Sequence, residues 1–177
     1  MKLEVLVSAV NKDAAALISK MHIVTDAVLV NQCDCYAYET IAVQGGRVKC
    51  FSMPERGVGL SRNTALLHAS DDTVLFSDED IVLKPDYAEK IRRAYELLPD
   101  ADLILFNVEV AASRRTYWNR EIRRITYRNY GRYPAYSISA RLNALRRANV
   151  HYSLLFGGGA KYSNGEDSLF LRDCLKA

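Results

Sequence analysis

The sequence predicts an α/β fold in which a mainly parallel central sheet lies between two layers of helices. Several apolar runs have the length of strands and lack polar alternation, which is typical of strands buried on both faces. These runs are 3–10, 26–32, 74–76 and 101–110. Segments with a helical spacing of apolar residues separate most of them, and such alternation is typical of a parallel sheet.

Size and composition favour one domain over residues 1–177. The chain can bury one substantial core, and 49% hydrophobic with 25% charged residues is an ordinary globular balance. No apolar run approaches the roughly 18 residues of a membrane span, and the N-terminus lacks a signal-peptide pattern. We therefore expect a cytoplasmic protein.

The cysteines lack zinc-site spacing and are expected to be reduced thiols, at Cys33, Cys35, Cys50 and Cys174.

Local signals predict the elements of the first half. Asn11 is placed to cap a helix whose apolar positions run from Ala14 to Met21. Gly45 and Gly46 indicate a turn between strands at 40–43 and 47–53.

Further helices are predicted on both sides of the strand at 74–76. Ser61 is placed to cap a helix over 64–70. Pro85 and Asp86 open a helix that has apolar side chains from Tyr87 to Leu98 on one face.

The second half is less regular. Segment 113–136 admits antiparallel strands near 124–127 or a short helix over 117–125. We expect a short helix over 138–148, a glycine loop over 156–159 and a final helix that starts near Asp167.

Acidic residues follow the buried strand at 74–76. Side chains two apart on an extended chain point the same way, so Asp78 and Asp80 can converge while Glu79 points elsewhere. Paired carboxylates are hard oxygen ligands that suit Mn²⁺ or Mg²⁺. The alternative is an acidic loop that caps the next helix.

Polar residues also follow the neighbouring strands. Asn31 and Gln32 end one strand, and 61–63 precedes the next helix. In open α/β sheets, ligands bind beyond the carboxyl ends of the strands. These positions and 78–80 therefore predict one binding site.

Charge is unevenly distributed along the chain. Between Asp71 and Asp80 there are five acids and no base, whereas Arg114 to Arg132 contains seven arginines and one acid. Aromatic residues are interleaved with those arginines. The sequence thus predicts two sites, one for a cation and one that faces an anionic ligand.

Four motifs, in this order, resemble family 2 glycosyltransferases, which have the GT-A (Rossmann-like) fold. These enzymes are inverting and depend on nucleotide sugars. The motifs are LVSAV at 6–10, GLSRNTALLHAS at 59–70, FSDEDIVLKPDY at 76–87 and YSNGEDSLF at 162–170. The resemblance covers nearly the whole chain and implies a hexosyltransferase of polysaccharide biosynthesis.

The resemblance assigns the donor site to the first half, residues 1–110. Asp78 and Asp80 match the Asp-x-Asp motif, in which Asp80 would bind Mn²⁺ or Mg²⁺ and Asp78 the ribose or the water shell of the metal. Arg62 would contact the nucleotide. Further donor-site positions are Ser8, Asn31, Gln32, Asn63 and Glu79. The amides at 31 and 32 stand where the family often has an acid, and they match the edge of uracil, which favours a UDP-sugar.

The second half, residues 111–177, would form the acceptor side. Asp167 matches the general base of the family, and Glu166 would orient the acceptor. Trp118, Gly158 and Gly159 are candidate acceptor contacts. The acceptor would be a glycan or a lipid-linked molecule, and the arginines would allow peripheral contact with an anionic membrane surface.

Other functions compete with this interpretation. Family members commonly continue beyond the Glu-Asp helix, whereas only 168–177 follow here, so we expect a truncated or minimal version. A non-catalytic relative is therefore an alternative, as is an RNA-binding protein that uses 114–136. A nucleotidyltransferase would require a glycine-rich, lysine-containing triphosphate loop, which is missing near the N-terminus. As a transferase, the protein is expected to bind no nucleic acid.

Overall fold

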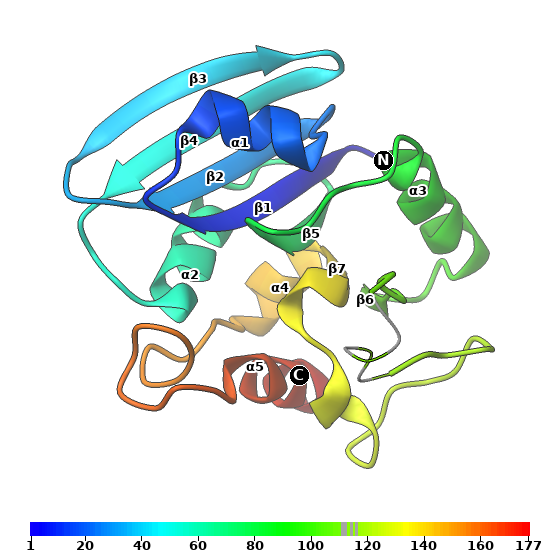
Figure 1. The fold of residues 1–177 in the computed structure, drawn as a ribbon. Coiled ribbons are helices and arrows are strands. Elements are labelled where there is room, and N and C mark those ends of the chain that lie inside the picture. The colour runs from blue at the N-terminus through cyan, green and yellow to red at the C-terminus, as the bar shows by residue number, and fades with distance from the viewer. Residues whose placement is uncertain (111–112, 114, 116) are drawn as a thin grey trace.

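A computed structural model describes residues 1–110, 113, 115 and 117–177, and these residues form a seven-stranded sheet (Figure 1). The strand order is β3-β4-β2-β1-β5-β7-β6. Residue 111, the predicted start of the second half, and Arg114 lie outside the described residues. The strands are β1 (Leu3–Val10), β2 (Asp26–Gln32), β3 (Ala37–Val43), β4 (Gly46–Met53), β5 (Thr73–Asp78), β6 (Leu103–Leu105) and β7 (Ile138–Arg141).

The centre of the sheet is parallel, as predicted. β1 pairs in parallel with β2 and β5, and β2 pairs in parallel with β4. Antiparallel strands complete both edges, with β3 beside β4 and with β7 and β6 beyond β5. The register places Ser8 opposite Asp78. The polar ends of β1, β2 and β5 therefore share one edge of the sheet.

Helices cover both faces of the sheet, which confirms the three-layer prediction (Figure 1). α1 and α3 share one core with the sheet, to which Leu17 and Tyr87 contribute. α2, α4 and α5 share the other core, in which Phe76 and Phe170 pack together. The helices are α1 (Ala14–Met21), α2 (Val58–His68), α3 (Tyr87–Leu97), α4 (Leu142–Ala148) and α5 (Glu166–Lys176). None of the described helices is both long and apolar enough to cross a membrane.

The start of α1 differs from the prediction. Asp13, rather than Asn11, caps the helix, and its Oδ1 accepts a hydrogen bond from the Ala16 backbone N–H at 2.8 Å. Asn11 instead has a φ of 50° and donates its backbone N–H to the carbonyl of Gln32. The chain must turn after β1 before the helix can begin.

The start of α2 was also wrongly predicted. The helix begins at Val58 rather than 64, and Ser61 is buried inside it instead of capping it. Gly59 does not break the helix, because its lack of a side chain allows close packing. A Cβ at Gly59 would lie 2.4 Å from the carbonyl oxygen of Ser153.

The second half of the chain differs most from the predicted secondary structure. β6 covers only Leu103–Leu105, rather than 101–110, because it is an edge strand that pairs with β7 alone. The predicted helix over 138–148 divides into β7 and α4, since Ile138 to Ala140 are buried as in a strand covered on both faces. Residues 117–129 form neither of the two predicted alternatives. The 3₁₀ helices η2 (Tyr130–Arg132) and η3 (Ala135–Ser137) follow.

Candidate active site

A buried arginine joins three carboxylates at the carboxyl edge of the sheet. Arg62, on α2, is only 4% exposed. Its Nη2 donates to Asp78 Oδ1 at 3.0 Å, and its Nη1 donates to Asp167 Oδ1 at 2.8 Å. Nη1 also lies 3.5 Å from Glu166 Oε1. The structure thus brings together four of the predicted site residues from three elements, α2, β5 and α5.

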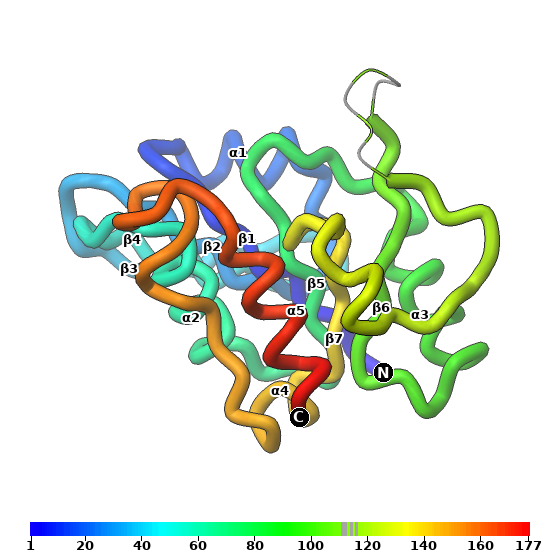
Figure 2. The backbone as a smooth tube through the Cα atoms, turned by 90° about the horizontal axis from the view of Figure 1, so that it is seen from below, coloured from blue at the N-terminus to red at the C-terminus, as the bar shows by residue number. Residues whose placement is uncertain are grey.

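The ends of secondary structure elements position this cluster. Asp78 is the last residue of β5, and Arg62 lies in the second turn of α2. α5 begins at Glu166, directly after Gly165, whose φ of 103° favours glycine. Acids in a first helical turn also suit the positive end of the helix dipole. Figure 2 shows α5 lying between the orange and the yellow segments of the chain.

The guanidinium of Arg62 lies over an aromatic ring. Its Cζ lies 5.1 Å from the centroid of the Tyr152 ring, which stacks on Phe170 at 4.2 Å. Burial alone would lower the pKa of Arg62, but Tyr152, Asp78 and Asp167 around it hold that pKa above its ordinary value. Arg62 therefore stays charged and fixed among its partners.

Asp167 is held at both carboxylate oxygens. Oδ1 binds Arg62, and Oδ2 accepts a hydrogen bond from the Ala135 backbone N–H at 2.9 Å. Burial raises its pKa to about 6, although Arg62 and the Ala135 N–H act in the opposite direction. A carboxylate with a pKa just below neutrality is suited to take up a proton from a substrate.

The acidic residues after β5 do not share one environment. β5 ends at Asp78, so the alternation of an extended chain does not continue to Asp80, which is exposed in the following turn. Glu79 turns toward β1: Oε2 accepts a hydrogen bond from the Val10 N–H at 2.7 Å, and Oε1 pairs with Lys12 at 3.1 Å. Glu79 therefore anchors the end of the strand.

Asp78 and Asp80 carry hard carboxylate oxygens, the type of ligand that Mg²⁺ and Mn²⁺ prefer. No three His, Cys, Asp or Glu side chains among the described residues are arranged as a complete metal site. Asp80 makes no hydrogen bond or ion pair with any of the described residues. Mg²⁺ and Mn²⁺ are commonly held by one or two carboxylates, with water and phosphate oxygens filling the other positions.

The amides at the end of β2 hold backbone loops. Asn31 Oδ1 accepts from the Lys12 N–H at 3.0 Å, and its Nδ2 donates to the Lys12 carbonyl at 2.8 Å. Gln32 Nε2 donates to the carbonyls of Glu55 at 2.9 Å and Gly57 at 3.2 Å. Gln32 Oε1 accepts no hydrogen bond from the described residues. The amide oxygen of Asn31 does have a partner, the Lys12 N–H.

Ser8 and Asn63 connect α2 to its surroundings. Ser61 Oγ donates to Ser8 Oγ at 2.9 Å, which joins the helix to β1. Asn63 makes a pair of hydrogen bonds with the Tyr152 backbone, at 2.8 and 2.9 Å. Asn63 thereby holds the backbone of Tyr152, whose ring lies against Arg62.

The predicted acceptor contacts lie in two different places. The Gly158 carbonyl accepts a hydrogen bond from the Val58 N–H at 2.9 Å, so the glycine loop packs against the start of α2. Gly159 has a φ of 79°. Trp118 is 44% exposed, with the Arg115 guanidinium 4.4 Å from its ring. Among the described residues, no hydrogen bond joins Trp118 to the carboxylate cluster.

Two contributors to the site were not predicted from the sequence. Tyr136 is half-buried, and its pKa is raised mainly by burial and further by Asp78, Asp80 and Asp167. This phenol therefore lies near both the predicted metal ligands and the predicted base. The Ala135 N–H is the second, and a backbone donor leaves no signal in residue type.

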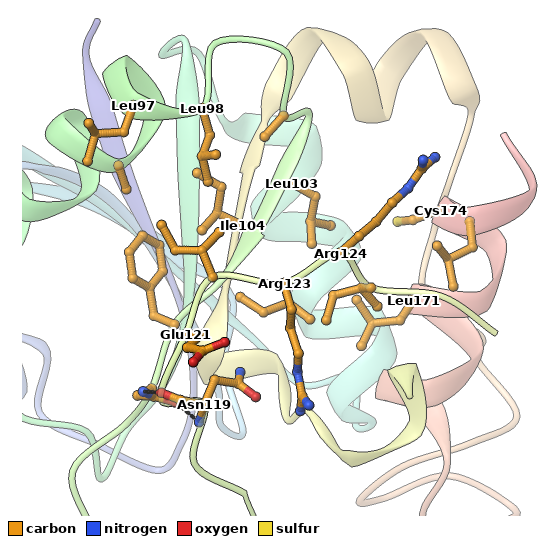
Figure 3. Close-up of a pocket in the computed structure, with 18 of the residues that line it drawn as sticks. Leu97, Leu98, Leu103, Ile104, Asn119, Glu121, Arg123, Arg124, Leu171 and Cys174 are labelled. Atoms are coloured by element: carbon orange, nitrogen blue, oxygen red, sulfur yellow. Dashed lines mark hydrogen bonds between the residues drawn. The ribbon is translucent and has the colours of Figure 1, made fainter. Parts of the chain in front are cut away.

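A separate apolar cavity of about 690 Å³ lies between α3, β6 and α5 (Figure 3). Leu103 and Ile104 line it from β6, and Leu171 from α5, one turn after Asp167. Arg123 and Arg124 belong to the segment that closes another side. The cavity thus borders the site but does not contain the carboxylate cluster.

Comparison with solved structures finds a similar fold in S. aureus TarS. The crystal structure of S. aureus TarS 1-349 in complex with UDP-GlcNAc matches with a TM-score of 0.68 and 18% identity, over 99% of this chain and 53% of that chain. The complex with UDP matches with a TM-score of 0.61 and 14% identity over the same shares. This chain therefore spans about half the length of these structures. A search of curated proteins found no match.

The sequence itself matches a known family. The model of Glycosyl transferase family 2 matches residues 4–155, which include Arg62 and Asp78 but end before α5. The fold of the TarS structures confirms the predicted GT-A architecture. The chain belongs to glycosyl transferase family 2.

Proposed function

We propose that the protein is an inverting glycosyltransferase that moves a sugar from a UDP-sugar to a hydroxyl group of a glycan or a lipid-linked acceptor. The observation that carries the proposal is the cluster in which Arg62 binds both Asp78 and Asp167. Family membership supports glycosyl transfer and disfavours a nucleotidyltransferase. The UDP-GlcNAc complex of TarS, a protein of similar fold, supports a UDP-sugar donor.

Asp167 would be the general base. A sugar hydroxyl is a weak nucleophile, so a carboxylate must accept its proton as the oxygen bonds to the anomeric carbon. The bond from that carbon to the diphosphate oxygen breaks at the same time. Attack from the opposite face inverts the anomeric centre. Glu166, which adjoins Asp167 at the start of α5, would orient the acceptor.

Arg62 would position Asp167 rather than react itself. Its charge opposes the rise in the pKa of Asp167 that burial causes. Arg62 also links this carboxylate to Asp78, so that base and donor would keep a fixed separation. The sequence also predicts that Arg62 contacts the nucleotide. This contact would require a diphosphate oxygen to replace one of its carboxylate partners.

Asp80 and Asp78 would hold Mn²⁺ or Mg²⁺ together with the donor diphosphate. The bound ion would neutralise charge that develops on the departing nucleoside diphosphate. The exposure of Asp80 supports this role, because its carboxylate can face solvent and ligand. Glu79 would act indirectly, through the strand end that it anchors.

Gln32 is the better candidate of the two amides for recognition of uracil. Its Oε1 can accept the N3–H of that base, while its Nε2 stays on the loop before α2. Asn31 already binds Lys12 through both ends of its amide and would support the site from behind. Ser8 and Asn63 would likewise hold the donor site in place.

The acceptor would approach from the side of residues 117–136. Trp118 offers an exposed aromatic face for a sugar, and Gly158 leaves open space beside the start of α2. The cavity behind α5 could receive the apolar part of a lipid-linked acceptor. The arginines of this segment would suit its phosphate or an anionic membrane surface.

Calorimetric titration with UDP, GDP and dTDP, with and without Mn²⁺, tests the donor site. We expect UDP to bind with Mn²⁺ and this binding to be lost in Asp80→Ala. Glu96→Ala removes an exposed carboxylate on α3 and is the matched control. No metal-dependent binding of any nucleotide by the folded protein would contradict the proposal. Salt-sensitive binding of single-stranded RNA, indifferent to Mn²⁺, would favour the RNA-binding alternative.

A further inference from the structure

Two cysteines meet directly after the last residue of β2. Cys33 and Cys35 lie on a bend of the chain, and their Sγ atoms are 3.7 Å apart. Cys33 is half-buried and Cys35 is exposed. Closure of a disulfide requires the sulfurs to approach to about 2.05 Å, a small movement from this arrangement.

The environment of the pair differs from that of the other cysteines. Burial raises the pKa of Cys50 to about 11 and that of Cys174 to about 12, so both thiols are unreactive. Backbone hydrogen bonding at Cys35 lowers the pKa of Cys33. The hydrogen bond to Cys33 raises the pKa of Cys35. Cys33 is therefore the better nucleophile of the pair.

The loop that holds the pair is attached to the loop before α2. Arg56 Nη1 donates to the Cys33 carbonyl at 3.0 Å, and Nη2 pairs with Asp34 at 2.7 Å. Tyr36 donates its hydroxyl to Glu55 Oε1 at 2.6 Å.

Gln32, the residue before Cys33, also binds the loop before α2. Its Nε2 donates to the carbonyls of Glu55 and Gly57. Gly57 is the N-cap residue of α2, the helix that carries Arg62. Hydrogen bonds thus connect the Cys33 loop and Gln32, the proposed base-recognition residue, to the chain just before α2.

We propose that Cys33 and Cys35 form a reversible dithiol–disulfide pair whose oxidation weakens binding at the neighbouring nucleotide site. The proposed disulfide depends only on the positions of the two cysteines and not on the proposed function. Its effect on nucleotide binding rests on the proposed function.

Oxidised glutathione, a small disulfide, can oxidise the pair in two thiol–disulfide exchanges. The Cys33 thiolate attacks one sulfur of the oxidant, forms a mixed disulfide and releases one glutathione thiolate. The Cys35 thiolate then attacks the Cys33 sulfur and releases the second glutathione. The protein loses two electrons, the oxidant gains them, and the cysteine protons pass to the released thiolates.

Peptide mass spectrometry after incubation in glutathione buffers tests the chemistry. We expect a Cys33–Cys35 disulfide that a thiol reductant reverses, while Cys50 and Cys174 become alkylated only after denaturation. Cys35→Ser should stop at the mixed disulfide on Cys33, and Cys174→Ser, the control, should still form the bond. The proposed disulfide would be refuted if Cys33 and Cys35 were alkylated independently and formed no disulfide at any glutathione ratio.

Two measurements on the reduced and oxidised protein test the coupling. Hydrogen exchange should change at residues 54–60 and stay constant in α3. UDP affinity in Mn²⁺ should fall by about fivefold or more on oxidation, and the Cys33→Ser/Cys35→Ser variant should not respond. Equal exchange and equal affinity in the two states would contradict the coupling. If neither state binds UDP, the proposed function fails, and the exchange experiment still decides the coupling.

Discussion

Arg62 and Asp167 are 105 positions apart in the sequence, yet Arg62 Nη1 donates a 2.8 Å hydrogen bond to Asp167 Oδ1. The same guanidinium binds Asp78 at the end of β5. The contact therefore connects the parallel-sheet half of the chain with the last helix.

Arg62→Met should destabilise the protein. The change leaves Asp78, Glu166 and Asp167 beside one another without their shared cation, and loss of one partner of a buried ion pair typically costs about 3 kcal/mol or more. Urea unfolding should show this loss. Arg92→Met, at an exposed position on α3, should stay within about 0.5 kcal/mol of the wild type. Wild-type stability of Arg62→Met would show that the cluster is not a structural unit.

Activity should depend on protonation of Asp167. Because its pKa is raised to about 6, Asp167 is protonated below that pH, and kcat/KM should fall about tenfold per pH unit there. Asp167→Asn should lose roughly 10²- to 10⁴-fold in kcat with UDP affinity retained. Full turnover of Asp167→Asn would assign the base to another group.

The same raised pKa affects stability in a defined direction. The folded state holds a proton on Asp167 that the unfolded chain releases at its ordinary pKa of 3.8. The contribution of Asp167 to the free energy of unfolding should therefore decrease as pH rises from 3.8 to about 6. Comparison of the wild type with Asp167→Asn by urea unfolding across this window measures it. An opposite slope would mean that the pairing with Arg62 outweighs burial.

Gly59→Ala should destabilise the protein by about 2 kcal/mol, despite the better helix propensity of alanine. The new Cβ would lie 2.4 Å from the Ser153 carbonyl oxygen, so α2 or the 150–155 segment must shift. Gly158→Ala is the matched control, because a Cβ there meets nothing within 4 Å. Thermal unfolding of both variants tests the packing. Equal stability of the two would mean that α2 has room to move.

Trp118→Ala should affect the acceptor and not the donor. Loss of an aromatic face should raise the acceptor KM by about tenfold, while UDP affinity stays unchanged. Tyr38→Ala removes an exposed aromatic ring from β3, at the opposite edge of the sheet, and should change neither value. A fall in UDP affinity in Trp118→Ala would move this residue to the donor side.

Local sequence determined much of the first half. Mainly apolar runs without alternation predicted the limits of β1 and β2 correctly, because strands buried on both faces carry mostly apolar residues on each. Arg62 and Asp78, which the motifs assign to one predicted site, are joined by a hydrogen bond in the structure.

Long-range packing decided what local patterns could not. The edge position of β6, and the burial that makes Ile138 to Ala140 a strand, depend on which segments lie alongside. Gly59 is helical because α2 packs closely against the chain at Ser153.

The sequence by itself thus determined the α/β class, the central strands and the residue types of the site. Only the tertiary structure decided that Arg62 binds Asp78 and Asp167 together, that Glu79 accepts a hydrogen bond from the Val10 N–H, and that the Ala135 N–H holds the second oxygen of Asp167. The physical reason is that residue spacing fixes directions only within one element. Contacts between elements depend on how their buried faces pack.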